Sequence, residues 1–248
     1  MISVIIVEDE APARDLLKAF ISKHSNLKLI GEAGDGFQGV KAINELKPDL
    51  IFLDIQMPKL NGFEMLEIIE HKPVIIFCTA YDEFALKAFE HNTADYLLKP
   101  FPLERFNAAV EKAISKVQSG TTDTEAYQNI AIQASDPSKF LERIVIRSGG
   151  AIHVVPATEL ECIEAEDDYV MVYGTKGHYL KQQTLKYYEE HLDPGIFLRV
   201  HRSAIVKIDA VNRIEPYSKD AFIAILKSGK KIPVSKAGYA RLKNVFDL

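Results

Sequence analysis

The first half of the chain alternates short apolar runs with amphipathic stretches. The runs are rich in β-branched residues, and apolar positions in the stretches between them recur with the period of a helix. Strands are predicted near residues 3–8, 27–32, 49–54, 73–79 and 94–98. Strands that are apolar throughout belong in a parallel sheet that is covered on both faces. The pattern therefore predicts a doubly wound α/β domain with a five-stranded parallel sheet, closed by a last helix near 102–117.

The pattern changes after this helix. Residues 119–139 are polar and turn-prone with little periodicity, as is typical of a linker. We therefore predict three segments, an α/β domain at 1–118, a linker at 119–139 and a second domain at 140–248.

The second domain has the pattern of a mainly β structure. Short strands follow one another closely, separated by turns that contain glycine. The expected strands have the sequences RIVIRS, AIHVVP, LECIEAE, YVMVYG, HYLKQQT, SAIVKI, AFIAIL and KKIPV. Helices are expected only over residues 185–191 and 236–245.

The composition is that of an ordinary soluble globular protein, with 47% hydrophobic and 26% charged residues. No run approaches the roughly 18 apolar residues of a membrane span, and the start MISVIIVEDE lacks the basic leader of a secretory signal. We expect a cytoplasmic protein with no membrane partner. Cys78 and Cys162 lie in apolar strand-like runs without metal-site spacing, so we expect buried reduced thiols.

Charge is distributed unevenly along the chain. The net charge of −5 argues against a generic nucleic-acid binder. Residues 140–195, however, hold 5 basic and 10 acidic residues, whereas 196–248 hold 11 basic and 4 acidic ones. The basic charge is therefore concentrated at the end of the chain, where it could attract a phosphate backbone.

Polar and charged residues end four of the predicted parallel strands. In chain order they are Glu8, Asp9, Glu10, Asp54, Thr79 and Lys99. The carboxyl ends of parallel strands meet at one edge of the sheet, so these side chains should converge. Clustered carboxylates repel one another unless a cation lies between them, which predicts a hard divalent ion such as Mg²⁺. The acidic run at 8–10 alone fits a solvated loop equally well, but the whole set favours a site.

Four segments in this half resemble the response-regulator receiver domain. They are VEDE at 7–10, LDIQMPKLNGFE at 53–64, CTAY at 78–81 and DYLLKPF at 95–101, and the resemblance covers about 1–118. It implies a phosphoprotein of a two-component system that accepts a phosphoryl group from a sensor histidine kinase. It also implies a homodimer when the protein is phosphorylated.

The resemblance assigns roles at the acidic edge. Asp54 resembles the phosphoacceptor, Glu8 and Asp9 the metal-binding acidic pair, and Gln56 the residue whose backbone carbonyl contacts the metal. Glu8 stands where aspartate is common, a change that keeps the charge but should alter the metal geometry. Mg²⁺ is the implied cofactor.

Three further residues resemble the family's phosphate contacts and switch. Thr79 and Lys99 resemble the phosphate contacts, and Tyr96 occupies the switch position three residues before the lysine. A phosphoryl group on Asp54 would draw the Thr79 hydroxyl toward it and leave space for Tyr96 to turn inward. Simple core packing of Tyr96 and a satisfied strand-end hydroxyl at Thr79 are the structural alternatives.

The second half resembles the LytTR-type DNA-binding domain over 140–248. The resemblance rests on CIEAEDDYVMVYG at 162–174, FLRVHRSAIVKIDAVNRIEPY at 197–217 and KKIPVSKAGYARL at 230–242. It implies an elongated β-rich fold that presents loops to successive major grooves of double-stranded DNA, at repeated promoter sites.

The same resemblance names candidate DNA contacts. Those expected at base edges are Arg202, Lys236, Asp168 and Tyr169, and those expected at the DNA backbone are Arg199, His201, Ser203 and Lys181. Arginine can read guanine bidentately, which suits Arg202 because it interrupts an apolar run. The alternatives are a surface ion pair for Arg202, a solvent-facing helix position for Lys236 and a buried structural role for His201.

Rival functions have less support. An aspartate-nucleophile phosphatase would need a second DxD-type motif, and the chain has no GxSxG, HExxH or GxxxxGKS element. No aromatic RNP-like strand supports RNA binding. We therefore expect a non-enzymatic transcription regulator, with a receiver-controlled protein-interaction module without DNA binding as the alternative.

Overall fold

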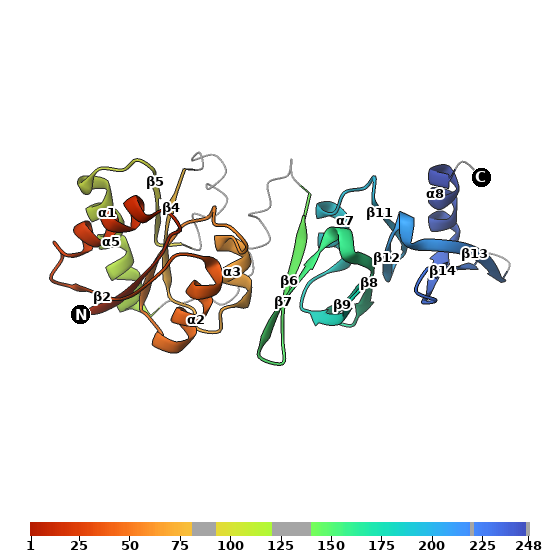
Figure 1. The fold of residues 1–248 in the computed structure, drawn as a ribbon, viewed down its shortest axis with the longest axis horizontal. Helices are drawn as coiled ribbons and strands as arrows, with labels where there is room; N and C mark the ends of the chain where they lie inside the picture. The colour runs from red at the N-terminus through yellow and green to blue at the C-terminus, as the bar shows by residue number, and fades with distance from the viewer. Residues whose placement is uncertain (81–92, 121–139, 219–220, 247–248) are drawn as a thin grey trace. The chain divides into compact units, whose positions relative to one another are not determined.

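The structure, a computed structural model, describes residues 1–80, 93–120, 140–218 and 221–246. The chain divides into two units, Met1–Ala134 and Ser135–Leu248, each with its own core (Figure 1). Most of the predicted linker and most of the amphipathic stretch between the fourth and fifth predicted strands fall outside the described residues, so the predicted boundaries stay predictions.

The first unit contains the predicted parallel sheet. Its strands are β1 (Ile2–Val7), β2 (Leu27–Ala33), β3 (Leu50–Leu53), β4 (Val74–Thr79) and β5 (Asp95–Leu98). They lie in the order β2-β1-β3-β4-β5, and every neighbouring pair is parallel. The described helices are α1 (Ala11–Ile21), α2 (Gly36–Leu46), α3 (Gly62–Ile68) and α5 (Leu103–Ser119). The doubly wound α/β prediction is confirmed.

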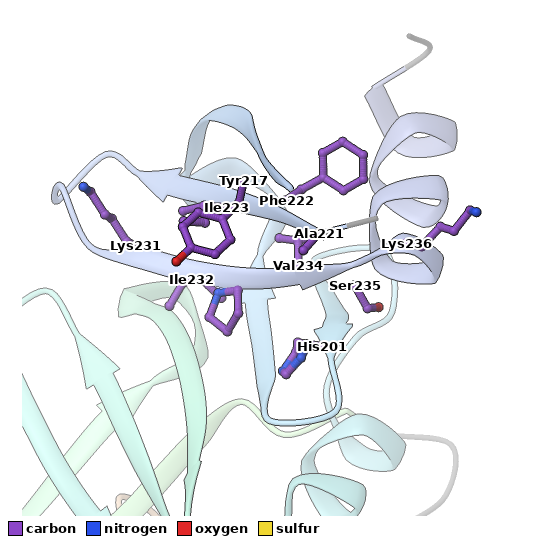
Figure 2. A pocket seen from close by; sticks show the side chains of 11 residues that line it. His201, Tyr217, Ala221, Phe222, Ile223, Lys231, Ile232, Val234, Ser235 and Lys236 are labelled. Carbon is purple, nitrogen blue, oxygen red and sulfur yellow. The ribbon is translucent and has the colours of Figure 1, made fainter. Parts of the chain in front are cut away.

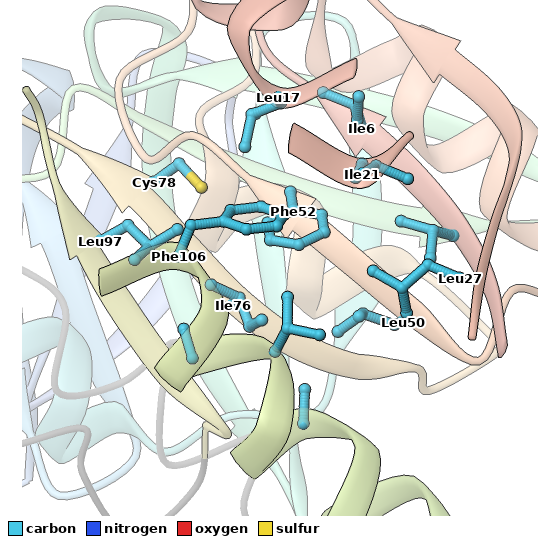
Figure 3. Close-up of a cluster of buried hydrophobic side chains, with 14 of the residues drawn as sticks. Ile6, Leu17, Ile21, Leu27, Leu50, Phe52, Ile76, Cys78, Leu97 and Phe106 are labelled. Carbon is cyan, nitrogen blue, oxygen red and sulfur yellow. The ribbon is translucent and has the colours of Figure 1, made fainter. Parts of the chain in front are cut away.

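Two layers of helices bury the sheet. α1 and α5 cover one face, where Phe52 of β3 stacks on Phe106 of α5 with ring centroids 5.2 Å apart (Figures 1 and 3). α2 and α3 lie on the other face, where Gly39 faces both Val7 and Met65. Because β3 is buried on both sides, its apolar residues each contribute about 1.5–3 kcal/mol through burial. Polar side chains can therefore appear only where the strands end.

The second unit is mainly β, as predicted. Its strands are β6 (Arg143–Ser148), β7 (Ala151–Pro156), β8 (Leu160–Glu166), β9 (Tyr169–Gly174), β10 (Gly177–Lys181), β11 (Phe197–His201), β12 (Ala204–Lys207), β13 (Val211–Ser218), β14 (Ala221–Leu226) and β15 (Lys231–Ser235). They form a β6-β7 hairpin, a five-stranded sheet in the order β10-β9-β8-β12-β11 and a three-stranded sheet in the order β13-β14-β15. The helices are α7 (Leu185–His191) and α8 (Lys236–Phe246), and short 3-10 turns, η2 (Ala157–Glu159) and η3 (Ile208–Ala210), precede β8 and β13.

Strands β11 and β13 were not among the predicted strands. Arg199 and His201 interrupt the apolar residues of β11, and β13 contains Pro216 and is largely exposed, so neither has the apolar run used to recognise the others. Tertiary pairing with β12 and β14 forms these two strands.

Both cysteines are buried free thiols, as predicted. Burial raises the pKa of Cys162 to about 12 and that of Cys78 well above its usual value, which disfavours the thiolate. Among the helices that the structure describes, none is long and apolar enough to cross a membrane.

A bulge near the end of β11 receives helix α8. Arg199 pairs with Ile205 and His201 with Ala204, so Val200 is the extra residue on its strand. The Ser235 hydroxyl donates to the Val200 carbonyl at 3.1 Å and accepts the backbone N–H of Gly238 at 3.0 Å. The serine thus caps α8 and attaches it to the bulge.

Replacing Gly238 by alanine should destabilise the second unit. A Cβ at this position would lie 1.8 Å from the Val200 carbonyl oxygen, so α8 would have to move away from β11. We expect Gly238→Ala to lower the free energy of unfolding by about 2 kcal/mol or more, despite alanine's higher helix propensity. Urea denaturation followed by circular dichroism measures this change.

Gly195→Ala is the matched control. Its added Cβ would meet only the end of the Asp193 side chain, whose Oδ1 atom would lie 3.2 Å away and accepts the Gly195 backbone N–H at 2.8 Å, so a shift of a few tenths of an ångström is enough. Its effect should stay within about 0.5 kcal/mol. If the two variants lost the same free energy of unfolding, the close approach of α8 to β11 would be contradicted.

Candidate functional site

Three carboxylates meet at the carboxyl ends of β1 and β3. These neighbouring strands pair Val7 with Leu53, and the backbone N–H of Asp54 donates to the Val7 carbonyl at 2.9 Å. One carboxylate oxygen from each of Glu8, Asp9 and Asp54 lies within 4.8 Å of the others. The strand order reverses at β1 and β3, which is where open α/β sheets bind their ligands.

Lys99 supplies the positive charge in this cluster. Its Nζ lies 2.7 Å from Glu8 Oε2 and 2.8 Å from Asp54 Oδ2, with Glu10 further off at 3.8 Å. The backbone N–H of Lys99 donates to the Thr79 carbonyl at 2.8 Å, which ties the ends of β4 and β5 together. Burial alone would lower the pKa of Lys99, but its hydrogen bonds to Asp54 and Glu8 raise it. The lysine therefore stays protonated beside the two acids.

Glu8 is the most deeply buried carboxylate of the cluster, and burial disfavours its charged form. Burial and the charge of Asp54 raise its pKa to about 7, although Lys99 acts in the opposite direction. Such a carboxylate is stabilised in its charged form by a further cation. Three acidic oxygen donors with this spacing fit Mg²⁺, which prefers oxygen ligands and retains several waters.

Backbone contacts hold the acidic loops in place. The Arg14 guanidinium of α1 donates to the carbonyls of Glu8 at 2.6 Å and Asp9 at 3.0 Å. The backbone N–H of Gln56 donates to Asp54 Oδ1 at 3.1 Å, so the peptide of Gln56 does lie beside the acid. Arg14 was not predicted, because only its position on the adjacent helix, and no motif, connects it with the site.

Tyr96 lies on β5 beside an ion cluster. Asp95 accepts two hydrogen bonds from Arg105, at 2.8 and 2.7 Å, and Lys112 Nζ lies 3.0 Å away. Burial would raise the pKa of Asp95, but the bonds to Arg105 and Lys112 lower it overall. Arg105 also donates to the Tyr96 carbonyl and lies 5.5 Å from the centre of its half-buried ring. The predicted switch residue is therefore in contact with α5.

In the second unit, the candidate DNA contacts gather at one end of the five-stranded sheet. β8 and β12 are antiparallel, so the β8–β9 turn with Asp168 and the β11–β12 turn with Arg202 lie at the same end. The Ala165 backbone N–H donates to the Ser203 carbonyl at 2.9 Å and connects them. Arg202, Asp168 and Tyr169 are exposed. Within the described ranges, the Arg202 guanidinium has no hydrogen bond or ion pair. The surface ion pair that was the alternative role for Arg202 is therefore not found among these residues.

Four other candidates are bonded within the unit. Lys181 Nζ donates to the Val145 carbonyl at 2.6 Å, and Arg199 Nη1 lies 2.5 Å from Glu189 Oε2. His201 Nδ1 lies 2.7 Å from Ser203 Oγ. These side chains are available to DNA only where they can make a second contact or give up the present one.

Lys236 is the first residue of α8 and is exposed. With His201 it lines a pocket of about 560 Å³ whose floor includes Ile232 and Val234 of β15. Figure 2 shows Lys231 toward one end of this pocket and Lys236 at the start of the helix. Lys236 therefore shares this pocket with His201, the residue that precedes Arg202 in the chain.

Comparison with known proteins matches both units. The response regulator receiver domain family matches residues 4–111, and the LytTr DNA-binding domain family matches residues 150–247. Sensory transduction protein LytT of Bacillus anthracis is 34% identical over 99% of both chains, and that of Bacillus subtilis (strain 168) is 34% identical over the full length of both. The response regulatory domain of protein mrkE from Klebsiella pneumoniae is 38% identical over 47% of this chain and 98% of that chain, with a TM-score of 0.43.

Glu8 should make the metal-free protein less stable as the pH rises. Its pKa of about 7 in the folded state exceeds the usual 4.5, so the folded protein holds a proton that the unfolded chain has released. This stabilisation is fully present below about pH 4.5 and is lost as the pH rises through about 7, at most about 3 kcal/mol. Urea denaturation with a chelator at about pH 5 and about pH 8 measures the change.

Glu8→Gln should remove this pH dependence, because glutamine does not titrate. Glu45→Gln, at an exposed position on α2, is the control and should retain it. If Glu8→Gln kept the same difference between the two pH values as the wild type, the buried acid would not be its origin.

Proposed function

Because this chain belongs to the response regulators that carry a LytTr DNA-binding domain, we propose that phosphorylation of Asp54 controls sequence-specific binding to double-stranded DNA. The observation that carries this proposal is the buried Asp54 carboxylate, 2.8 Å from Lys99 and beside two further acids. A sensor histidine kinase is the proposed phosphoryl donor. We further propose that the phosphorylated protein forms homodimers on repeated promoter sites, in the cytoplasm.

The proposed chemistry is transfer of a phosphoryl group to one oxygen of Asp54. That oxygen attacks phosphorus, the bond from phosphorus to the donor breaks, and an acyl phosphate remains. Lys99 neutralises charge on the transferring oxygens. When bound, Mg²⁺ would neutralise charge on the same oxygens, and Glu8, Asp9, Asp54 and the Gln56 carbonyl would hold it.

The proposed switch connects the acyl phosphate to the contacts of β5. The Thr79 hydroxyl, at the end of β4, would bond the new phosphate oxygens, and Tyr96 would turn inward. The contacts of Arg105 with the ring and carbonyl of Tyr96 support this proposal, because a rotation of the ring would change the surface of α5.

The proposed DNA surface is the end of the five-stranded sheet together with the start of α8. Arg202 and Lys236 are proposed to read base edges, with Asp168 and Tyr169 from the neighbouring turn. Lys181, His201 and Ser203 would contact the DNA backbone. We propose 1–118 and 140–248 as the limits of the two domains, with 119–139 as the linker.

Asp54→Ala should abolish phosphorylation by a small phosphodonor such as acetyl phosphate in the presence of Mg²⁺. Among the residues that the structure describes, Glu8 is the only other carboxylate that combines burial with the contact to Lys99 and the neighbouring acids, and it is proposed to bind the metal. Incorporation of radiolabelled phosphate measures the result. Asp15→Ala, at an exposed position on α1, should be labelled like the wild type. Labelling that persists in Asp54→Ala would refute the assignment.

Arg202→Ala should weaken binding to a specific duplex by about 1–3 kcal/mol while leaving nonspecific binding largely intact. The reason for this expectation is that the exposed Arg202 guanidinium has no hydrogen bond or ion pair among the residues that the structure describes. Fluorescence anisotropy with a selected and a scrambled duplex measures both affinities.

Lys176→Ala is a control of equal charge change, since its side chain is 78% exposed and paired with Glu159. Equal losses of affinity for both duplexes would indicate that Arg202 contacts a phosphate and not a base. If the wild type bound no duplex from a genomic fragment pool, a receiver-controlled protein-interaction module would be the better explanation.

A further inference from the structure

The turn that carries Arg202 is held by the side chain of Arg199. Its Nη2 donates to the Arg202 carbonyl at 2.8 Å, and its Nε donates to the His201 carbonyl at 3.4 Å. Its Nη1 donates to Glu189 Oε2 at 2.5 Å. All three guanidinium nitrogens are therefore engaged, and the side chain is only 24% exposed. A DNA phosphate would have to compete with these bonds.

Two helices anchor this arginine. Glu189 comes from α7, and its carboxylate also lies 3.9 Å from Arg241 of α8. Arg241 in turn donates to the backbone carbonyl of Arg199 at 3.1 Å. The three side chains of Glu189, Arg199 and Arg241, which we call the turn brace, connect α7, β11 and α8.

The turn itself has further restraints. His201 Nδ1 lies 2.7 Å from Ser203 Oγ, and the Ser203 backbone N–H donates to the same nitrogen at 3.3 Å. The bulge at Val200 sets the direction in which the chain enters the turn. The backbone of Arg202 is thus restrained on both sides, while the residue itself is exposed to solvent.

From these contacts we propose that Glu189 and Arg199 are positioning residues that aim Arg202 at a base edge, and that Arg199 is not a DNA contact. The proposal rests on the proposed DNA binding. A side chain that reads a base bidentately must be oriented, and orienting its backbone beforehand lowers the entropic cost of binding. Sequence discrimination should therefore depend on a glutamate that repels DNA.

Because Glu189 is negatively charged, the loss of its side chain has opposite effects if it positions Arg202 and if it only repels DNA phosphates. Removing an acid near DNA favours binding to any duplex, because phosphate repulsion falls. If Glu189 acted only through its charge, its loss would raise the affinity for all duplexes alike. If it positions Arg202, its loss lowers the preference for the correct sequence instead.

The test uses the full-length protein with acetyl phosphate and Mg²⁺. A duplex selected from a random pool by the wild type is compared with a scrambled duplex of the same length. Glu189→Ala should reduce the ratio of the two affinities about tenfold, without weakening binding to the scrambled duplex. Glu189→Gln, which keeps an oxygen acceptor for Arg199, should retain most of the ratio.

Glu190→Ala is the matched control. It removes the same charge from the next residue of α7, where the acid lies 3.7 Å from Lys186. The ratio of its affinities for the selected and the scrambled duplex should equal that of the wild type. Thermal unfolding by circular dichroism establishes that each variant is folded.

Arg199→Ala tests the second half of the proposal. If Arg199 acts through the turn brace, the variant should lose affinity for the selected duplex alone, and the dependence of affinity on salt should not change. A phosphate contact predicts equal losses on both duplexes and a salt slope smaller by about one. The latter result would overturn the role of Arg199.

Two outcomes separate this proposal from the proposed function. An unchanged ratio in folded Glu189→Ala, in a wild type that does prefer the selected duplex, would overturn the turn brace and leave DNA binding intact. A wild type that prefers no duplex would overturn both.

Discussion

The ammonium group of Lys99 between two buried carboxylates is the contact on which the first unit depends. Burying Glu8 and Asp54 as charges without a partner would cost several kcal/mol each, and Lys99 offsets part of this cost at the ends of β1 and β3. The lysine is in turn bonded through its backbone to Thr79. One ion cluster thus joins the ends of four strands, and a phosphoryl group added there would disturb all of them.

The second unit solves a related problem with backbone carbonyls. A turn that exposes an arginine side chain leaves peptide groups without strand partners, and such groups need other hydrogen bonds when they are shielded from water. Arg199 supplies them for His201 and Arg202, and Glu189 balances its charge. In both units a half-buried cation therefore bonds directly to a residue that is proposed to act in function, Lys99 to Asp54 and Arg199 to Arg202.

Much of the acidic site was predictable because it follows from topology. Parallel strands bring their carboxyl ends together, so Glu8, Asp54 and Lys99 had to converge once the strands were recognised. The turn brace was not predictable, since Glu189 and Arg241 lie 10 and 42 positions from Arg199 and no periodicity relates them. Strand β13 was also missed, because pairing and not its own apolar pattern makes it a strand.

The sequence by itself determined the parallel sheet, the change to a mainly β half and the edge at which Asp54 lies, because hydrophobic periodicity reports which faces are buried. Only the tertiary structure decided which charges act on one another. Hydrogen bonds and ion pairs act over a few ångströms, and which residues come that close depends on how strands and helices pack. Arg199 and Arg202 look alike along the chain, yet one is bonded inside the unit and the other faces solvent.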